Sequence, residues 1–124
     1  MSKSVKPHIK FRNLAFRKQG GFCYYCNFPM WEKDIAGFSS RYNLSLRQAN
    51  QFKCTAEHLL ARQDGGKDVE DNIVAACLAC NHKRHRGKRK VVPEPQEYIE
   101  LIQQRLEQGR WHPFYPTLNG KESN

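Results

Sequence analysis

The sequence predicts a single α+β domain over residues 1–124, with a helix near each end and two short strands between them. Three observations predict this fold class. Apolar residues recur at helical spacing near both ends, two short apolar runs in the middle have the length of strands, and two Cys-x-x-Cys pairs bracket the central segment. With 124 residues, 39% of them hydrophobic, the chain is long enough for one domain with a thin core. Such a core commonly needs a metal ion or disulfides to hold it together.

The first predicted element is a helix over about residues 7–20. Its apolar face is expected to contain Phe11, Leu14 and Ala15, which recur at helical spacing. The aliphatic part of the Lys18 side chain is expected to lie along the same face. The pair Gly20-Gly21 follows and predicts the end of the helix.

The central part of the domain is expected over about residues 22–90. Residues 28–43 contain Pro29, Gly37 and a pair of serines, so they are expected to be irregular, and residues 45–50 to form a short helix. A strand is predicted over residues 52–60, leading into a Gly-Gly turn at residues 62–68, and a second over residues 73–76. The basic segment that begins at Asn81 is expected to be helical until Gly87.

The last predicted element is a helix over about residues 95–108. Tyr98, Ile102 and Leu106 are spaced i, i+4, i+8, which places them on one helical face. Gly109 follows at the position where glycine commonly ends a helix. The chain after Pro116 is expected to fray.

The two Cys-x-x-Cys pairs predict a structural zinc site. Each pair can supply two adjacent ligands, so that Cys23, Cys26, Cys77 and Cys80 would complete a tetrahedral Cys₄ site with no open position for a substrate. The segment between the pairs is longer than in a simple zinc ribbon, which indicates an insertion between the two metal-binding turns. A redox pair and a chance spacing are the alternatives. The fifth cysteine, Cys54, is expected to be a small buried core residue.

The charge balance indicates a polyanionic partner. The chain has 21 Lys and Arg against 12 Asp and Glu, a formal net charge of +9. Its N-terminal residues have no apolar stretch of the signal-peptide type, and no run of residues is apolar and long enough to cross a membrane. We therefore expect a cytoplasmic location, where cysteines stay reduced, and no membrane partner.

The segment between the cysteine pairs resembles the HNH endonuclease family. The resemblance consists of Glu57-His58, the Gly65-Gly66 loop, Asn72 in front of an Ile-Val run, and Cys80-Asn81 followed by basic residues. It covers roughly residues 22–86, and its specificity comes from the combination rather than from any one part. It implies a ββα-metal core, in which two strands and a helix surround a catalytic metal ion, stapled here by zinc.

The resemblance also assigns roles to these residues. His58 matches the general base and Asn72 the residue that shapes the loop carrying it. Glu57 and Asn81 match the ligands of the catalytic metal, so the motif is an H-N-N variant, with Glu in place of the commoner Asp at position 57. His85 matches an optional further ligand, four residues after Asn81 and on the same helical face. Oxygen ligands of this kind suit Mg²⁺ or Mn²⁺.

The expected activity is hydrolysis of DNA phosphodiester bonds, with His58 removing a proton from water and the metal ion stabilising charge on the phosphate. The products implied by the family are 5′-phosphate and 3′-hydroxyl ends. Double-stranded DNA is the expected substrate and a monomer the favoured state. The expected phosphate contacts are Lys83, Arg84, Arg86, Lys88 and Arg89.

Two other functions remain open at this stage. The first is a non-catalytic zinc-ribbon module that binds nucleic acid, which would not need Glu57, His58 and Asn81 together. The second is an RNA-directed nuclease or toxin component, because phosphate contacts do not distinguish RNA from DNA. Outside this motif, His8 and His112 are expected at the surface.

Overall fold

The computed structural model describes residues 5–86 and 91–118, and its centre is a two-stranded antiparallel sheet. Strand β1, Cys54–His58, pairs with strand β2, Ile73–Cys77, in a register that places Cys54 opposite Cys77 and His58 opposite Ile73. The long connection between the strands contains two short 3₁₀ turns, Arg62–Asp64 and Glu70–Asn72. The predicted strands and the loop between them are therefore present.

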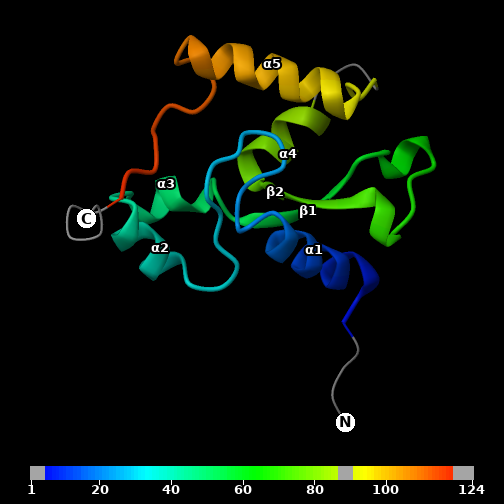
Figure 1. Ribbon diagram of the computed structural model, residues 1–124, viewed down its shortest axis with the longest axis horizontal. Helices are drawn as coiled ribbons and strands as arrows, with labels where there is room; N and C mark the ends of the chain where they lie inside the picture. Colours follow the sequence, from blue (N-terminus) through cyan, green and yellow to red (C-terminus); the bar gives the residue numbers. More distant parts are fainter. Residues whose placement is uncertain (1–4, 87–90, 119–124) are drawn as a thin grey trace.

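Helices lie on both sides of this sheet. In Figure 1, α4, Leu78–His85, lies above the two strands and α1, Pro7–Lys18, lies below them, while α5, Pro95–Glu107, covers α4 from outside. The side chain of Gln19, just after α1, accepts from the backbone N–H of Ala75 and donates to its carbonyl at 3.0 and 2.8 Å. This contact fixes the end of α1 against β2. The α+β class and the two flanking helices are thus confirmed.

The segment expected to be irregular contains a helix. Residues Ile35–Arg41 form α2, because the Asp34 side chain accepts a hydrogen bond from the backbone of Gly37 at 2.9 Å and so caps the first turn. Phe38 on α2 then packs into the core. Both features lie in the sequence, but the proline, glycine and serines of this segment outweighed them in the prediction. The expected short helix is present as α3, Leu46–Asn50, with a capping box made by Ser45 and Gln48.

Helix α4 begins earlier than predicted. It starts at Leu78 rather than at Asn81, because the Cys77 sulfur accepts from the backbone N–H of Cys80 at 3.4 Å and caps the first turn. The second Cys-x-x-Cys pair therefore spans the start of this helix. The predicted helix end at Gly87 lies outside the described residues.

The chain after α5 folds back over the core. Trp111 and His112 are both buried, with 6% and 2% of their surfaces exposed, so the prediction of a surface position for His112 is wrong. The rings of Phe28 and Phe52 lie beside the His112 ring, at 4.8 and 5.2 Å between centroids. The backbone N–H of Thr117 donates to Tyr42 at 3.1 Å, so the chain stays attached at least that far. Among the described residues no helix has the length and apolar character of a membrane span.

Candidate active site and metal centre

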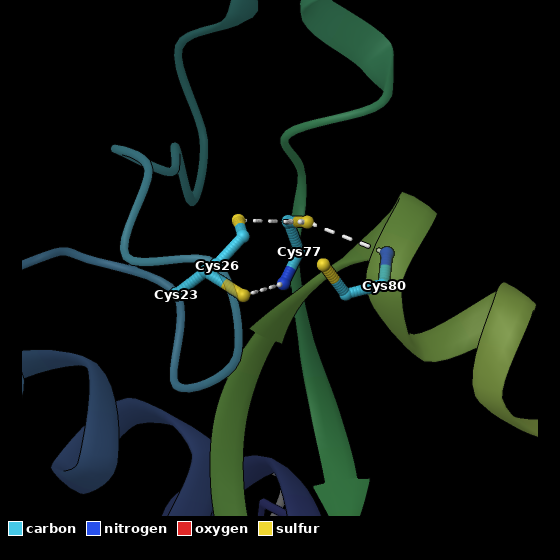
Figure 2. A group of neighbouring side chains, drawn as sticks. All are labelled: Cys23, Cys26, Cys77 and Cys80. Carbon is cyan, nitrogen blue, oxygen red and sulfur yellow. Dashed lines mark hydrogen bonds between the residues drawn. The ribbon is translucent and has the colours of Figure 1, made fainter. Parts of the chain in front are cut away.

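The four paired cysteines form one compact cluster. Figure 2 shows Cys23 and Cys26 on one loop, Cys77 where β2 meets α4, and Cys80 on the first turn of that helix. All four are buried, and their sulfur atoms lie within 4.8 Å of one another. The sulfurs of Cys26 and Cys77 are 3.9 Å apart, close to the roughly 3.8 Å that follows for two sulfurs at 2.3 Å from a tetrahedral zinc ion. The cluster therefore suits a closed Cys₄ site.

N–H groups donate to the sulfur atoms of the cluster. Backbone N–H groups donate to the sulfurs of Cys23 and Cys77 at 3.3 to 3.4 Å, and the indole N–H of Trp111 donates to the sulfur of Cys80 at 3.3 Å. Burial opposes ionisation of Cys23, but hydrogen bonds from Cys26, Cys77 and Cys80 outweigh it and lower the pKa of Cys23 well below its usual value. Hydrogen bonds with Cys23, Cys26 and Cys77 raise the pKa of Cys80. Four sulfur atoms this close together can act as the ligands of one metal cation.

A second group of predicted residues meets in a separate, open pocket. The pocket has a volume of about 460 Å³ and lies between β1, the loop after it, α4 and the start of α1. Glu57, His58, Asn81 and His85, all expected in the catalytic site, contribute to its wall. The full lining is His8, Ala56, Glu57, His58, Ala61, Arg62, Gln63, Asn81 and His85.

Glu57 is the most buried charged group of the pocket, with 1% of its surface exposed. Its Oε2 accepts from the Tyr25 hydroxyl at 2.8 Å and from Arg84 Nη1 at 2.9 Å, while Oε1 lies 2.8 Å from His85 Nε2. Burial alone would raise the pKa of Glu57, but the hydrogen bonds from His85, Tyr25 and Arg84 outweigh it and lower that pKa. Glu57 is thus held as a carboxylate, with Oε1 next to His85, another residue of the pocket wall.

The amide of Asn81 is oriented with its oxygen uncommitted. Its Nδ2 donates to Thr55 Oγ1 at 3.0 Å and to the Ala56 carbonyl at 3.2 Å. Both hydrogen bonds use the amino group, and within the described part of the chain no residue donates to Oδ1. Asn81 therefore offers a carbonyl oxygen to the pocket, which is a ligand type that Mg²⁺ and Mn²⁺ accept.

His85 and Glu57 are close enough to share one ion. The 2.8 Å between His85 Nε2 and Glu57 Oε1 is near the roughly 3.0 Å that separates two neighbouring ligands at about 2.1 Å from an octahedral ion. A carboxylate can only accept, so Nε2 carries a proton in this arrangement, and an ion would have to replace that proton. Glu57, Asn81 and His85 thus fit a divalent ion in the chemistry of their donor atoms.

His58 stands at the end of β1 and faces the same pocket. The alternation of side chains along a strand would place Glu57 and His58 on opposite faces, but β1 ends at His58 and the chain turns into the Arg62–Asp64 segment. The ring atom Nε2 of His58 lies 2.6 Å from Oδ1 of Asp68. His58 and Glu57 can therefore serve one site although they are adjacent in the sequence.

Asn72 holds together the loop that follows His58. Its side chain accepts from the Leu60 backbone N–H at 2.8 Å and donates to the carbonyls of Leu60 and Lys67 at 3.0 and 3.1 Å. Gly66 has no room for a side chain, because a Cβ there would lie 1.7 Å from the Leu60 carbonyl oxygen. The Gly-Gly pair and Asn72 together fold the loop back onto the end of β1.

The residues predicted to contact phosphate differ in how exposed they are. Arg84 is 4% exposed, and its guanidinium donates to Glu57 and to the carbonyls of His58, Leu59 and Pro93. Lys83 is half-buried, and its ammonium donates to the Trp111 carbonyl at 2.9 Å. Arg86 is exposed at the end of α4. Lys88 and Arg89 lie outside the described residues. The buried position of Arg84 differs from the exposed one that a phosphate contact requires.

The sequence prediction gave three residues of the pocket or its neighbourhood no role in the site. Tyr25 lies between two cysteines of the chain, and its hydroxyl donates to Glu57. Asp68 was part of a predicted turn, and His8 a predicted surface residue, yet they contact His58 and the pocket wall respectively. Arg84 carried one usable signal, since it follows the buried Cys80 by four residues and so shares its helical face.

A comparison with known protein families gives a match to the central segment of the chain. The family model of the HNH endonuclease matches residues 47–87, which run from α3 to just beyond α4 and include every predicted catalytic residue. No curated protein and no solved structure gives a significant match to the chain. Residues 47–87 are thus similar to the HNH endonuclease family, which is the family that the motifs of this segment resemble.

Proposed function

We propose that this protein is a metal-dependent endonuclease that hydrolyses phosphodiester bonds in DNA. The observation that supports the proposal best is the convergence of Glu57, His58, Asn81 and His85 on one open pocket of about 460 Å³. Such a pocket combines a candidate general base with oxygen and nitrogen donors for a divalent ion. The match of residues 47–87 to the HNH endonuclease family supports nuclease chemistry in general.

In the proposed mechanism, His58 removes a proton from a water molecule in the pocket. The resulting hydroxide forms the new bond to phosphorus while the bond from phosphorus to O3′ breaks. The leaving O3′ takes a proton from solvent, and His58 returns its proton to solvent. A Mg²⁺ or Mn²⁺ ion bound by Glu57, Asn81 and His85 would supply stabilisation of the negative charge that develops on the phosphate.

The other buried groups have supporting roles in this proposal. Tyr25 and Arg84 hold Glu57 as a carboxylate, so that it can act as a ligand in spite of its burial. The Cys₄ cluster binds a structural zinc ion, which joins the loop of Cys23 to the junction of β2 and α4. For Arg84 we propose this positioning role in place of a phosphate contact. Arg86 stays a candidate contact with the DNA backbone.

The test is relaxation of a supercoiled plasmid by the zinc-loaded protein with Mg²⁺, with Mn²⁺ or with EDTA. Cutting is expected with either ion and not with EDTA. His58→Ala is expected to lower the cutting rate by about 10²-fold or more, the usual contribution of a general base. His82→Ala is the matched control, because His82 lies on the same helix as His85 but is exposed and does not line the pocket.

The outcomes separate the candidate functions. Activity that is unchanged in His58→Ala would remove His58 from the chemistry. A wild-type protein that binds the plasmid and never cuts it would contradict the DNA endonuclease. An RNA substrate offered in the same buffers then distinguishes an RNA-directed nuclease from a binding module.

A further inference from the structure

Asp68 makes the shortest contact to the proposed general base. It lies on the loop between the strands, ten positions after His58, and its Oδ1 is 2.6 Å from His58 Nε2. The His58 side chain is only 12% exposed and that of Asp68 is 34% exposed, so the pair is partly shielded from water. The distance between the two atoms is well below the roughly 4 Å within which a surface ion pair is counted.

The contact determines which nitrogen of His58 carries the proton. A carboxylate has no proton to give, so at 2.6 Å the hydrogen must sit on His58 Nε2. Arg62 Nε also approaches Nε2, at 3.1 Å, but it cannot donate to a nitrogen that is already protonated. Its Nη2 instead pairs with both oxygens of Asp68, at 3.2 and 3.3 Å. The lone pair of the neutral ring is therefore on Nδ1.

The loop is built so that Asp68 reaches this position. The Asn72 side chain donates to the carbonyl of Lys67, the residue just before Asp68, at 3.1 Å. The Gly-Gly pair allows the preceding turn, in which Gly65 has a φ of +95°. A second cation, His8 when protonated, lies 3.8 Å from the other Asp68 oxygen. Asp68 is thus held from both sides.

We propose that Asp68 is a positioning residue of the nuclease site. Its carboxylate fixes the His58 ring with the proton on Nε2, so that Nδ1 is the atom that takes the proton from water. The inference rests on the proposed nuclease function, but the state of the ring can be measured without any substrate. In this arrangement Asp68 acts through His58 and does not touch the DNA.

The experiment compares Asp68→Ala and Asp68→Asn with wild type. Asp71→Ala is the matched control, because Asp71 is an exposed acid of the same loop, three residues further on. The first measurement is nitrogen-15 NMR of the imidazole rings near pH 8, where an ordinary histidine is neutral, with His58→Gln used to assign the His58 signals. The second is kcat and KM for plasmid cutting with Mg²⁺.

In wild type and Asp71→Ala, we expect the His58 ring to carry its proton on Nε2. In Asp68→Ala, we expect a mixture of the two neutral forms and a kcat lower by about 10- to 100-fold, by analogy with the loss of a hydrogen-bond partner from a metal-binding histidine. KM should change less than about twofold, because Asp68 contributes to catalysis through His58. Asp68→Asn keeps an oxygen acceptor without its charge and should recover part of the loss.

Two results would overturn the inference while leaving the nuclease intact. One is a His58 ring that keeps its proton on Nε2 in Asp68→Ala, and the other is a kcat for that variant equal to that of Asp71→Ala. A wild-type protein that cuts no substrate overturns the proposed function instead. The NMR result would then still decide whether Asp68 fixes the ring.

Discussion

The two candidate metal sites differ in how their ligands are used. At the cysteine cluster all four ligand residues are buried and enclosed, and N–H groups already point at three of the sulfurs. At the pocket, Glu57 is buried but Asn81 and His85 border open space, and Asn81 Oδ1 has no donor among the described residues. A closed set of ligands stabilises a fold, whereas an open set leaves positions for water and substrate. The proposed structural zinc ion and the proposed catalytic ion therefore call for different kinds of site.

The largest expected effect is the loss of the closed site. Cys77→Ser should bind less than a tenth of the zinc of wild type and lose its cooperative unfolding transition, because structural zinc contributes on the order of 10 kcal/mol, comparable to the whole stability of a small domain. Metal analysis and chemical denaturation measure both. Cys54→Ala is the control, since Cys54 is buried outside the cluster. Full zinc content in Cys77→Ser would contradict the Cys₄ site.

Glu57→Gln tests whether the open site also stabilises the fold. The substitution removes the negative charge opposite buried Arg84, and an unpaired buried cation costs roughly 3–5 kcal/mol of unfolding free energy. Denaturation of the zinc-loaded protein measures the loss. Glu97→Gln, on the exposed side of α5, should change stability by less than about 0.5 kcal/mol. Equal stability of the two variants would show that Glu57 and Arg84 do not depend on each other.

The pH dependence of stability tests the burial of His112. Burial, and then the charge of Lys83, lower the pKa of His112 to about 4, and no described residue pairs with its Nε2. In the unfolded chain His112 binds a proton below its ordinary pKa of about 6.5, whereas in the folded chain it stays neutral until the pH nears 4. The free energy of unfolding therefore falls as the pH drops from about 6.5 to 4. The total loss is about 3 kcal/mol.

His112→Phe should remove this part of the pH dependence, because phenylalanine fits among the same aromatic rings and does not titrate. The measurement is the free energy of unfolding at pH 7 and at pH 5 for wild type and variant. If both chains lose the same stability between these pH values, His112 is not responsible for the change.

The smallest expected effect links the two sites. Tyr25→Phe removes one hydrogen bond to the Glu57 carboxylate, and bonds to charged groups contribute about 1.5–3 kcal/mol. Zinc content should stay at wild-type level while Mn²⁺ affinity, measured by calorimetry, decreases. Tyr24→Phe, at the exposed neighbouring position, should change neither quantity. A fall in zinc content in Tyr25→Phe would show that Tyr25 is needed by the cluster itself.

Much of the architecture could be predicted because it depends on local patterns in the sequence. Helical spacing placed α1 and α5, and the cysteine pairs indicated which distant segments meet. Helix α2 was missed because its stability comes from the Asp34 cap and from Phe38, whose burial depends on tertiary contacts. The partners of His58 and Glu57 were missed for a related reason. Asp68 and Tyr25 reach them only after a loop has closed and a sheet has formed, which spacing along the chain does not show.

The Tyr25 hydroxyl has a consequence for engineering this protein. Tyr25 stands between two of the proposed zinc ligands, Cys23 and Cys26, yet its hydroxyl donates to the Glu57 carboxylate in the pocket at 2.8 Å. The first cysteine loop is consequently not an interchangeable part. A Cys-x-x-Cys loop taken from a zinc-binding protein could supply the two cysteines. Without a tyrosine at the position of Tyr25, however, the Glu57 carboxylate would lose one hydrogen-bond donor.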